Sequence, residues 1–491
     1  MNSYQSAAPA LRQNSVHLPD RSPAAAARLL FLSSSLLTDR MLRHSSLMSR
    51  LNSSDVRIWT SACLEYCEQD VATAATVDRM PELAPFREFP YAYLRRLNDF
   101  AWDTRLSPPS RISMMKHVRN RSLSPLMRAL TVPASAIAAL GLEERLESWL
   151  ERFLLAYERS PEATRLLKEY RPTVVVTTGP HRYEEPAIIA SAKRMGIPTL
   201  AFITSWDNIT TKNRIPFRHD GYLVWSEQMK EELLRFYPYV SDRDVTVVGA
   251  PQFDVFFQDR FRETRSIFCN RVGLRADLPI ILYALGSPNF LKEHHGALAL
   301  AERVEAGELG DVQLLVRPHP LFDGGAEAKA FERFGSRVRV QRTGDRDVPT
   351  ARRAQRTQDI TDWVNTFRHA DVVVNLSSTA SVDAAICDKP VVNLDYDPEP
   401  GQPKAELVRD VNHVWTHFKP IAESGGVRLV GSTTEMVTAI RDYLKNPRAD
   451  AEKRRWIVNR VCGRVDGHAG ARFADAVVDF AVRSTAGSYS K

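Results

Sequence analysis

The feature that most constrains the fold of this chain is a repeated alternation of short apolar runs, polar or glycine-containing loops and helical stretches. Such alternation predicts parallel β-sheets with helices on both faces, which is an α/β fold of the doubly wound, Rossmann-like type. The expected strands form two series, 29–32, 56–59, 173–178, 198–203, 221–225 and 245–248, followed by 280–285, 312–316, 338–341, 371–376 and 390–394. Two series predict two similar domains.

The length of 491 residues agrees with two domains, because a single core seldom grows to this size. Arginine-rich helical stretches at 86–170 interrupt the first series and predict a helical insertion in the first domain. We therefore expect a disordered lead at 1–22, a first domain at 23–258, a second domain at 259–465, and a terminal helix and tail at 466–491.

Two observations predict a cytoplasmic protein. The sequence has no run of eighteen or more apolar residues, so no transmembrane helix is expected. The five cysteines are odd in number and lack Cys-x-x-Cys spacing, which is typical of reduced thiols.

Two loops of the second domain have the residues of a phosphate site. Doubly wound sheets bind ligands at the carboxyl ends of their strands. Gly286 and Ser287 follow the first strand, where backbone N–H groups can hold an oxyanion, unless the pair is a plain turn. Arg317 and His319 follow the next strand, in a turn that Pro318 and Pro320 stiffen. The pair suits a phosphate, unless the histidine is buried and only hydrogen-bonded.

A third loop, Ser377-Ser378-Thr379, follows the strand at 371–376 and opens a helix. Hydroxyl groups and the free amides of a helix N-terminus can hold a phosphate, whereas ordinary N-capping would need only one of these hydroxyls. Asp383, one turn into the helix, can accept hydrogen bonds from ribose hydroxyls. The three loops together predict a nucleotide site.

The stretch ADVVVNLSSTASVDAAICDKPVVNL at 370–394, preceded by LLVRPHP at 314–320, resembles the donor-binding half of GT-B glycosyltransferases. It is similar in particular to the glycerophosphotransferases of teichoic acid synthesis and to the Kdo transferases of bacterial capsules. The ending Asp466-Gly467-His468-Ala469 is similar to the end of the glycerophosphotransferase family. The resemblance extends over about residues 170–480.

The resemblance implies a GT-B fold, with two Rossmann-like domains facing each other across a cleft. It implies that the donor phosphates are held by Arg317, His319, Ser377, Ser378 and Thr379, and the ribose by Asp383. Two positions depart from the pattern, since many GT-B enzymes have glutamate in place of Asp383 and glycine in place of Asp388.

The first domain is expected to supply the acceptor site and the catalytic base. Displacement of a nucleotide by a hydroxyl group needs a base near the attacking oxygen. The candidates are Asp207, His181 and Glu185, each of which also has a structural alternative in a cap, a loop or an ion pair. Trp206, Asn208 and Lys212 lie beside Asp207 and are the candidate acceptor-binding residues.

We therefore expect a glycosyltransferase that uses a nucleotide-activated donor as its substrate, with no cofactor and no metal ion, and modifies a cell-surface polysaccharide or lipid-linked acceptor. One alternative is a glycerophosphotransferase or a sugar-nucleotide 2-epimerase of the same fold, for which the Glu184-Glu185 pair provides carboxylates. Another is a non-catalytic nucleotide-binding or nucleic-acid-binding protein. No nucleic-acid partner is expected, because the sequence has neither a Walker motif nor an RNP motif.

The charge of the chain suggests one further partner. Basic residues outnumber acidic ones by 66 to 59, and many arginines lie at 95–128 beside Trp102, Met114 and Met115. This segment predicts either a face that rests on anionic lipid at the inner side of the plasma membrane, or a solvated face packed on the first domain.

Overall fold

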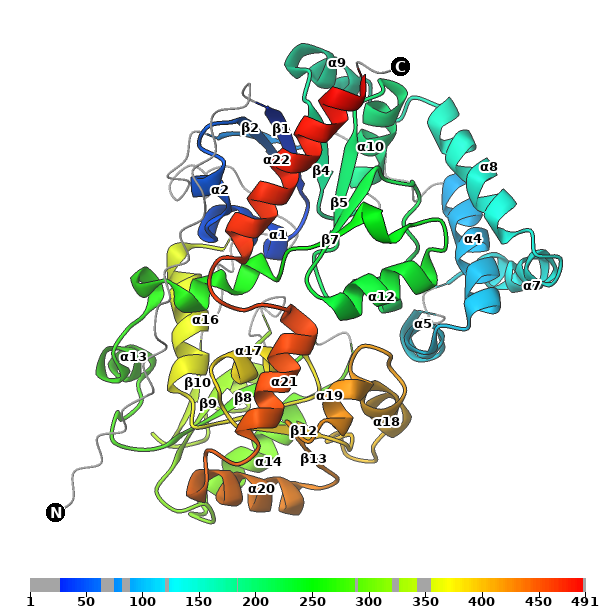
Figure 1. Cartoon of the computed structure of the whole chain (residues 1–491). Coiled ribbons are helices and arrows are strands. Elements are labelled where there is room, and N and C mark those ends of the chain that lie inside the picture. The colour runs from blue at the N-terminus through cyan, green and yellow to red at the C-terminus, as the bar shows by residue number, and fades with distance from the viewer. Residues whose placement is uncertain are drawn as a thin grey trace.

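The computed structural model describes residues 27–62, 75–81, 89–119, 123–182, 184–287, 290–319, 326–341 and 355–488 (Figure 1). The expected lead at 1–22 and the cysteines Cys63 and Cys67 lie outside these residues.

The first domain is built on a seven-stranded parallel sheet with the order β3-β2-β1-β4-β5-β6-β7. Its strands are β1 (Arg28–Ser33), β2 (Asp55–Thr60), β3 (Thr76–Arg79), β4 (Val174–Thr177), β5 (Thr199–Phe202), β6 (Gly221–Val224) and β7 (Val245–Val247). The strand order reverses between β1 and β4, and ligands bind at such a switch point in open α/β sheets.

The second domain is built on a six-stranded parallel sheet with the order β10-β9-β8-β11-β12-β13. Its strands are β8 (Ile280–Ala284), β9 (Gln313–Arg317), β10 (Val338–Val340), β11 (Val372–Asn375), β12 (Val391–Leu394) and β13 (Arg428–Val430). The prediction of two doubly wound domains is confirmed. The sequence did not predict β3 and β13, because these edge strands are short and only partly buried, and so lack an apolar run.

The helical insertion lies between β3 and β4 and stands beside the first sheet (Figure 1). Its helices are α4 (Tyr91–Leu106), α5 (Pro109–Met114), the π-helical turn η1 (Met115–Arg119), α6 (Pro125–Ala129), α7 (Thr131–Ala139), α8 (Glu143–Ala156) and α9 (Pro161–Tyr170). Of the described helices, none is by itself long and apolar enough to cross a membrane; Pro125–Ala139 and α8 pass that test only as a pair bent by 119°.

The remaining helices cover the sheets. Around the first sheet are α1 (Leu36–His44), α2 (Leu47–Arg50), α10 (Glu185–Arg194), α11 (Asn208–Thr211), α12 (Glu227–Phe236) and the turn η3 (Asp242–Asp244). The second domain has η5 (Asp259–Phe261), α13 (Arg265–Val272), α14 (His294–Glu305), α15 (Ala326–Lys329), α16 (Thr357–His369), α17 (Thr379–Ile386), α18 (Ala405–His413), α19 (Lys419–Glu423), α20 (Thr433–Lys445) and α21 (Ala451–Cys462).

The chain passes between the domains twice. It leaves the first domain through the 3₁₀-helical turn η4 (Pro251–Phe257), and it returns in α22 (Ala469–Ser488), which lies along the first sheet (Figure 1). Asp254 of η4 joins the two crossings, because its carboxylate accepts the N–H groups of Ala469 and Gly470 at 3.0 and 2.7 Å. One buried apolar cluster spans both domains.

The segment at 95–128 does not form the single exposed basic face that its arginines suggested. Trp102, Met114 and Met115 are buried, and so are Arg95 and Arg111. Helix α5 instead packs on the second domain, where Met114 joins an apolar cluster with Leu407, Val411 and Trp415. Trp102 and Arg95 pack on the first domain, in agreement with the second alternative. Met114 packs on the second domain, which charge patterning does not reveal.

Candidate active site

The predicted donor residues lie at adjoining strand ends of the second sheet. Strands β9, β8 and β11 are neighbours and parallel, so the residues that follow them share one edge. This edge carries Arg317 and His319 after β9, Gly286 and Ser287 after β8, and the loop 376–379 after β11. The structure therefore brings together three loops, the first and last of which, beginning at Gly286 and Leu376, are 90 residues apart in the sequence.

The loop 376–379 is held in shape by hydrogen bonds within the second domain. Ser378 is the N-cap of α17 and accepts the N–H of Ala380 at 3.3 Å, while Asn375 accepts the N–H of Ser378 at 3.0 Å. Ser377 has a φ of 31°, and its hydroxyl group donates to Asn412. Capping thus accounts for Ser378, and a phosphate at this end of α17 would face the backbone N–H groups and Thr379.

Glu293, which the sequence analysis did not single out, connects two of the donor loops. Its buried carboxylate accepts the N–H of Gly286 and the N–H of Leu376, both at 2.6 Å. Burial raises the pKa of Glu293 to about 7, although both N–H groups oppose this shift. The N–H of Gly286 is therefore already engaged, and the expectation that it is free to bind an oxyanion is corrected.

Arg317 and His319 differ in charge state. Arg317 donates to the side-chain oxygen of Gln341 at 2.7 Å, which fixes its guanidinium at the end of β9. Burial, together with the nearby Arg317, lowers the pKa of His319 to about 4. At neutral pH Arg317 is the cation of this turn, and His319 is a neutral imidazole that acts through hydrogen bonds.

Asp383 lies deep at the base of the site. It is 7% exposed, and one of its oxygens accepts the indole N–H of Trp363 at 3.1 Å. Burial raises the pKa of Asp383 to about 6, against the opposing effects of Arg40 and Trp363. Asp388, at the other departure from the family pattern, has the positive φ (51°) that glycine would favour, and pairs with Arg454 at 2.9 Å.

Asp207 lies in the loop after β5 of the first sheet. Its oxygens accept the hydroxyl groups of Ser205 at 2.5 Å and Thr211 at 3.0 Å, and Lys212 lies 3.7 Å away. Burial raises the pKa of Asp207, but Lys212 and His417 outweigh this effect and hold it at about 2. Asp207 is therefore ionised at neutral pH and lies beside a cation.

His181 lies in the neighbouring loop, after β4. Burial, Lys212 and Arg182 lower its pKa to about 3, so the imidazole is neutral at pH 7. The backbone carbonyl groups of His181 and Arg182 both accept hydrogen bonds from Arg95 of the helical insertion, at 3.2 Å. The insertion thus supports this loop of the acceptor side.

Glu185 has a positioning role in the structure. Its side chain is fully buried at the start of α10, where it accepts the hydroxyl groups of Ser34 and Thr177 and the N–H groups of Thr178 and Gly179. The carboxylate therefore ties the end of β4 to the loop after β1. These contacts indicate a structural role for Glu185, through hydrogen bonds rather than through the expected ion pair.

The loop after β5 and the loop before α17 contact each other. The indole N–H of Trp206 lies 3.4 Å from the hydroxyl oxygen of Thr379, and its ring meets His417 edge-on, with centroids 4.9 Å apart. His417 Nδ1 also lies 3.2 Å from the hydroxyl oxygen of Thr210. Trp206 and Asn208 are both buried, and His417 contacts this loop although no local sequence signal distinguished it.

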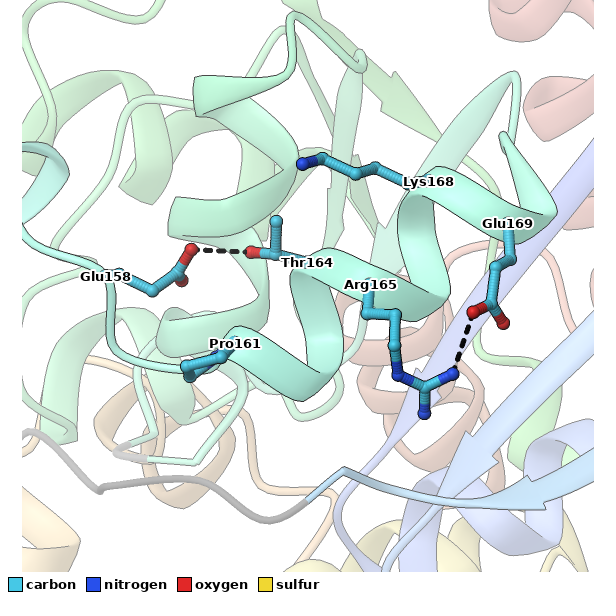
Figure 2. A pocket seen from close by; sticks show the side chains of 6 residues that line it. All are labelled: Glu158, Pro161, Thr164, Arg165, Lys168 and Glu169. Carbon is cyan, nitrogen blue, oxygen red and sulfur yellow. Dashed lines mark hydrogen bonds and ion pairs between the residues drawn. The ribbon is translucent and has the colours of Figure 1, made fainter.

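Figure 2 shows a surface pocket that is separate from these loops. It is lined by residues of α9 and the turn before it, with Arg165 paired to Glu169 at 2.8 Å. None of the predicted site residues lines it. Throughout the described ranges there is also no group of three or more histidine, cysteine, aspartate or glutamate residues that could hold a metal ion.

The chain was compared with protein families, with curated sequences and with solved structures. The sequence profile of the family "CDP-Glycerol:Poly(glycerophosphate) glycerophosphotransferase" matches residues 189–479. No curated protein sequence matches the chain.

Several solved structures have the same GT-B fold over nearly the whole chain. Staphylococcus aureus MnaA, solved with UDP, is 11% identical with a TM-score of 0.53 and covers 92% of this chain and 96% of its own. The UDP-GlcNAc 2-epimerase of Neisseria meningitidis, solved with UDP-GlcNAc, is 13% identical with a TM-score of 0.52. The match covers 92% of this chain and 100% of the epimerase chain. A variant of the wall teichoic acid polymerase TagF is 11% identical with a TM-score of 0.51. The match covers 93% of this chain and 90% of the TagF chain. At these identities the similarity shows the fold alone.

Proposed function

The chain belongs to the CDP-glycerol:poly(glycerophosphate) glycerophosphotransferase family, and from this premise we propose that it transfers glycerol phosphate from CDP-glycerol to a cell-surface polymer or its lipid-linked precursor. It is a transferase of GT-B type, and the epimerase alternative is not favoured. The observation that carries the proposal is the match of the family profile to the whole donor domain and to the Asp207 loop.

In the proposed reaction, the acceptor hydroxyl group attacks the glycerol-bearing phosphorus of the donor. A new P–O bond forms to the acceptor, the P–O bond to CMP breaks, and the hydroxyl proton passes to a base. Arg317, His319 and the N-terminus of α17 would hold the phosphates, since cations and helix N-termini stabilise the charge that develops on a leaving phosphate.

Asp207 is the proposed base. It is 27% exposed at the side chain, and its loop reaches the donor loop through Trp206. A carboxylate with a pKa of about 2 is a weak base, but the negative charge of a bound donor would raise this pKa. His181 is the second candidate, because its neutral imidazole lies in the adjoining loop.

The donor is tested by thermal shift of the purified protein with CDP, CMP, UDP, GDP and dTDP. We expect the cytidine nucleotides to stabilise the protein most, by about 2.7 kcal/mol at a hundredfold excess over Kd. The His319→Ala variant should lose this stabilisation, whereas His413→Ala, at a half-exposed histidine of the same domain paired with Asp395, should keep it. No stabilisation of the folded wild-type protein by any nucleotide would contradict the proposed donor site.

We further propose that the enzyme works in the cytoplasm, at the inner face of the plasma membrane. Three large apolar side chains in the helical insertion are strongly exposed: Leu126 (60%), Val132 (75%) and Leu140 (71%). The residues from 129 to 142 have no charged side chain; Arg128 precedes them, and Glu143 and Glu144 follow them. An uncharged helix with exposed apolar side chains suits the interface of a bilayer, and Arg128 at its start can meet anionic lipid.

Vesicle flotation checks this membrane contact. We expect the wild-type protein to float with anionic vesicles, and the double variant Val132→Glu/Leu140→Glu to remain in solution. Ile267→Glu, which changes an apolar residue of α13 that is 54% exposed, is the matched control and should float normally. Equal recovery of the wild-type protein and the double variant would refute the contact.

A further inference from the structure

Arg40 belongs to the first domain, but its guanidinium group contacts the second domain. The residue is on α1 and is 7% exposed. Its guanidinium carbon lies 3.8 Å from the ring centroid of Trp363 on α16. The same helix contacts the second domain again through Arg43, which donates to the carbonyl oxygen of Gln355 at 2.8 Å. Helix α1 is therefore held across the domain boundary independently of Arg40.

Trp363 connects Arg40 to the donor site. The face of its indole ring meets Arg40, and its N–H group donates to Asp383 at 3.1 Å. Burial has the largest effect on the pKa of Arg40 and lowers it to about 10. Asp383 opposes this shift, whereas Arg317 adds to it. Two guanidinium groups, one from each domain, thus lie close to the same carboxylate.

Three buried polar atoms at this place have no hydrogen-bond partner in the described part of the chain. They are Nε of Arg40, Oδ1 of Asp383 and Nε2 of Gln341, whose side-chain oxygen binds Arg317. Buried polar groups are nearly always paired in folded proteins, and exceptions concentrate where a ligand or an ordered water is missing. A cation, a carboxylate and an amide that converge in this way suit a ligand with both phosphate and hydroxyl groups.

We propose that Arg40 is a donor-binding residue supplied by the first domain, whose guanidinium binds a phosphate of the nucleotide donor together with Arg317. Guanidinium groups bind phosphate through a planar fork of N–H donors, and two of them can share one diphosphate. A phosphate held between residues of both domains would also keep the cleft closed while the donor is bound. This inference rests on the proposed function, because it requires a nucleotide donor in the cleft.

The test is the affinity of the full-length protein for CDP, measured by calorimetry. We expect Arg40→Met to weaken CDP binding at least tenfold and Arg40→Lys to weaken it less, because lysine keeps the charge but not the fork. Arg57→Met is the matched control, since Arg57 also lies over an aromatic ring (Tyr170, 4.5 Å) but on β2 of the first sheet, and its affinity should not change.

A double-mutant cycle separates donor binding from simple neutralisation of Asp383. If Arg40 binds the donor, Arg40→Met weakens CDP binding in the Asp383→Asn background as well as in the wild-type background. If Arg40 only neutralises Asp383, the substitution has no effect in the Asp383→Asn background, and the inference is overturned. Failure of the wild-type protein to bind any nucleoside diphosphate would refute the proposed function itself; equal binding by wild type and Arg40→Met would refute this inference alone.

Discussion

Asp207→Asn should lower kcat by about 10²–10⁴-fold, because this is the usual contribution of a positioned general base. Asparagine has the size of aspartate and keeps one oxygen to accept the hydroxyl group of Ser205, so the loop retains its shape. It cannot take a proton from the acceptor. Donor affinity should change little, since Asp207 lies on the acceptor side and the donor loops lie on the second sheet.

The measurement is steady-state transfer from CDP-glycerol, with the Kd for CDP determined in parallel. In the free protein Asp207 has a pKa of about 2 and stays ionised above pH 4, so the ratio of wild-type to variant kcat/KM should remain constant from pH 5 to 8. His181→Asn is the comparison, because that imidazole is the second candidate base in the adjoining loop. If kcat survives Asp207→Asn but falls with His181→Asn, the base is His181.

Arg214→Met should destabilise the protein by about 3–5 kcal/mol, because removal of one partner leaves the other charge buried and unpaired. Arg214 is 2% exposed and donates twice to the same oxygen of Glu147 on α8, at 2.9 and 3.0 Å. Its guanidinium also lies 4.2 Å from the ring centroid of Trp102 on α4. This side chain therefore fastens the helical insertion to the first domain.

Chemical denaturation measures the loss. The matched control is the double variant Arg214→Met/Glu147→Leu, in which no charge is left behind, and which should recover a large part of the stability. Arg165→Met, which breaks an exposed pair with Glu169 on α9, should cost less than about 1 kcal/mol. Equal stability of Arg214→Met and the wild-type protein would show that this ion pair does not anchor the insertion.

The sequence by itself determined the central strands of the two parallel sheets and the loops that we propose carry the donor site. Central strands such as β4, β8 and β11 are buried on both faces, so they appear in the sequence as unbroken apolar runs. The polar residues that follow them, such as Arg317 and Ser378, are predictable because parallel strands present their carboxyl ends at one edge. These are properties of short segments, which a single sequence contains completely.

The tertiary structure alone decided which polar groups act together. Glu293 binds Leu376, which is 83 positions away in the sequence. His417 contacts Thr210 across 207 positions, and Arg40 contacts Trp363 across more than 300. Burial also decided the charge state of His319 and the structural role of Glu185. The physical reason is that desolvation and hydrogen bonding depend on the neighbours that packing supplies, and no local pattern specifies neighbours so distant in the chain.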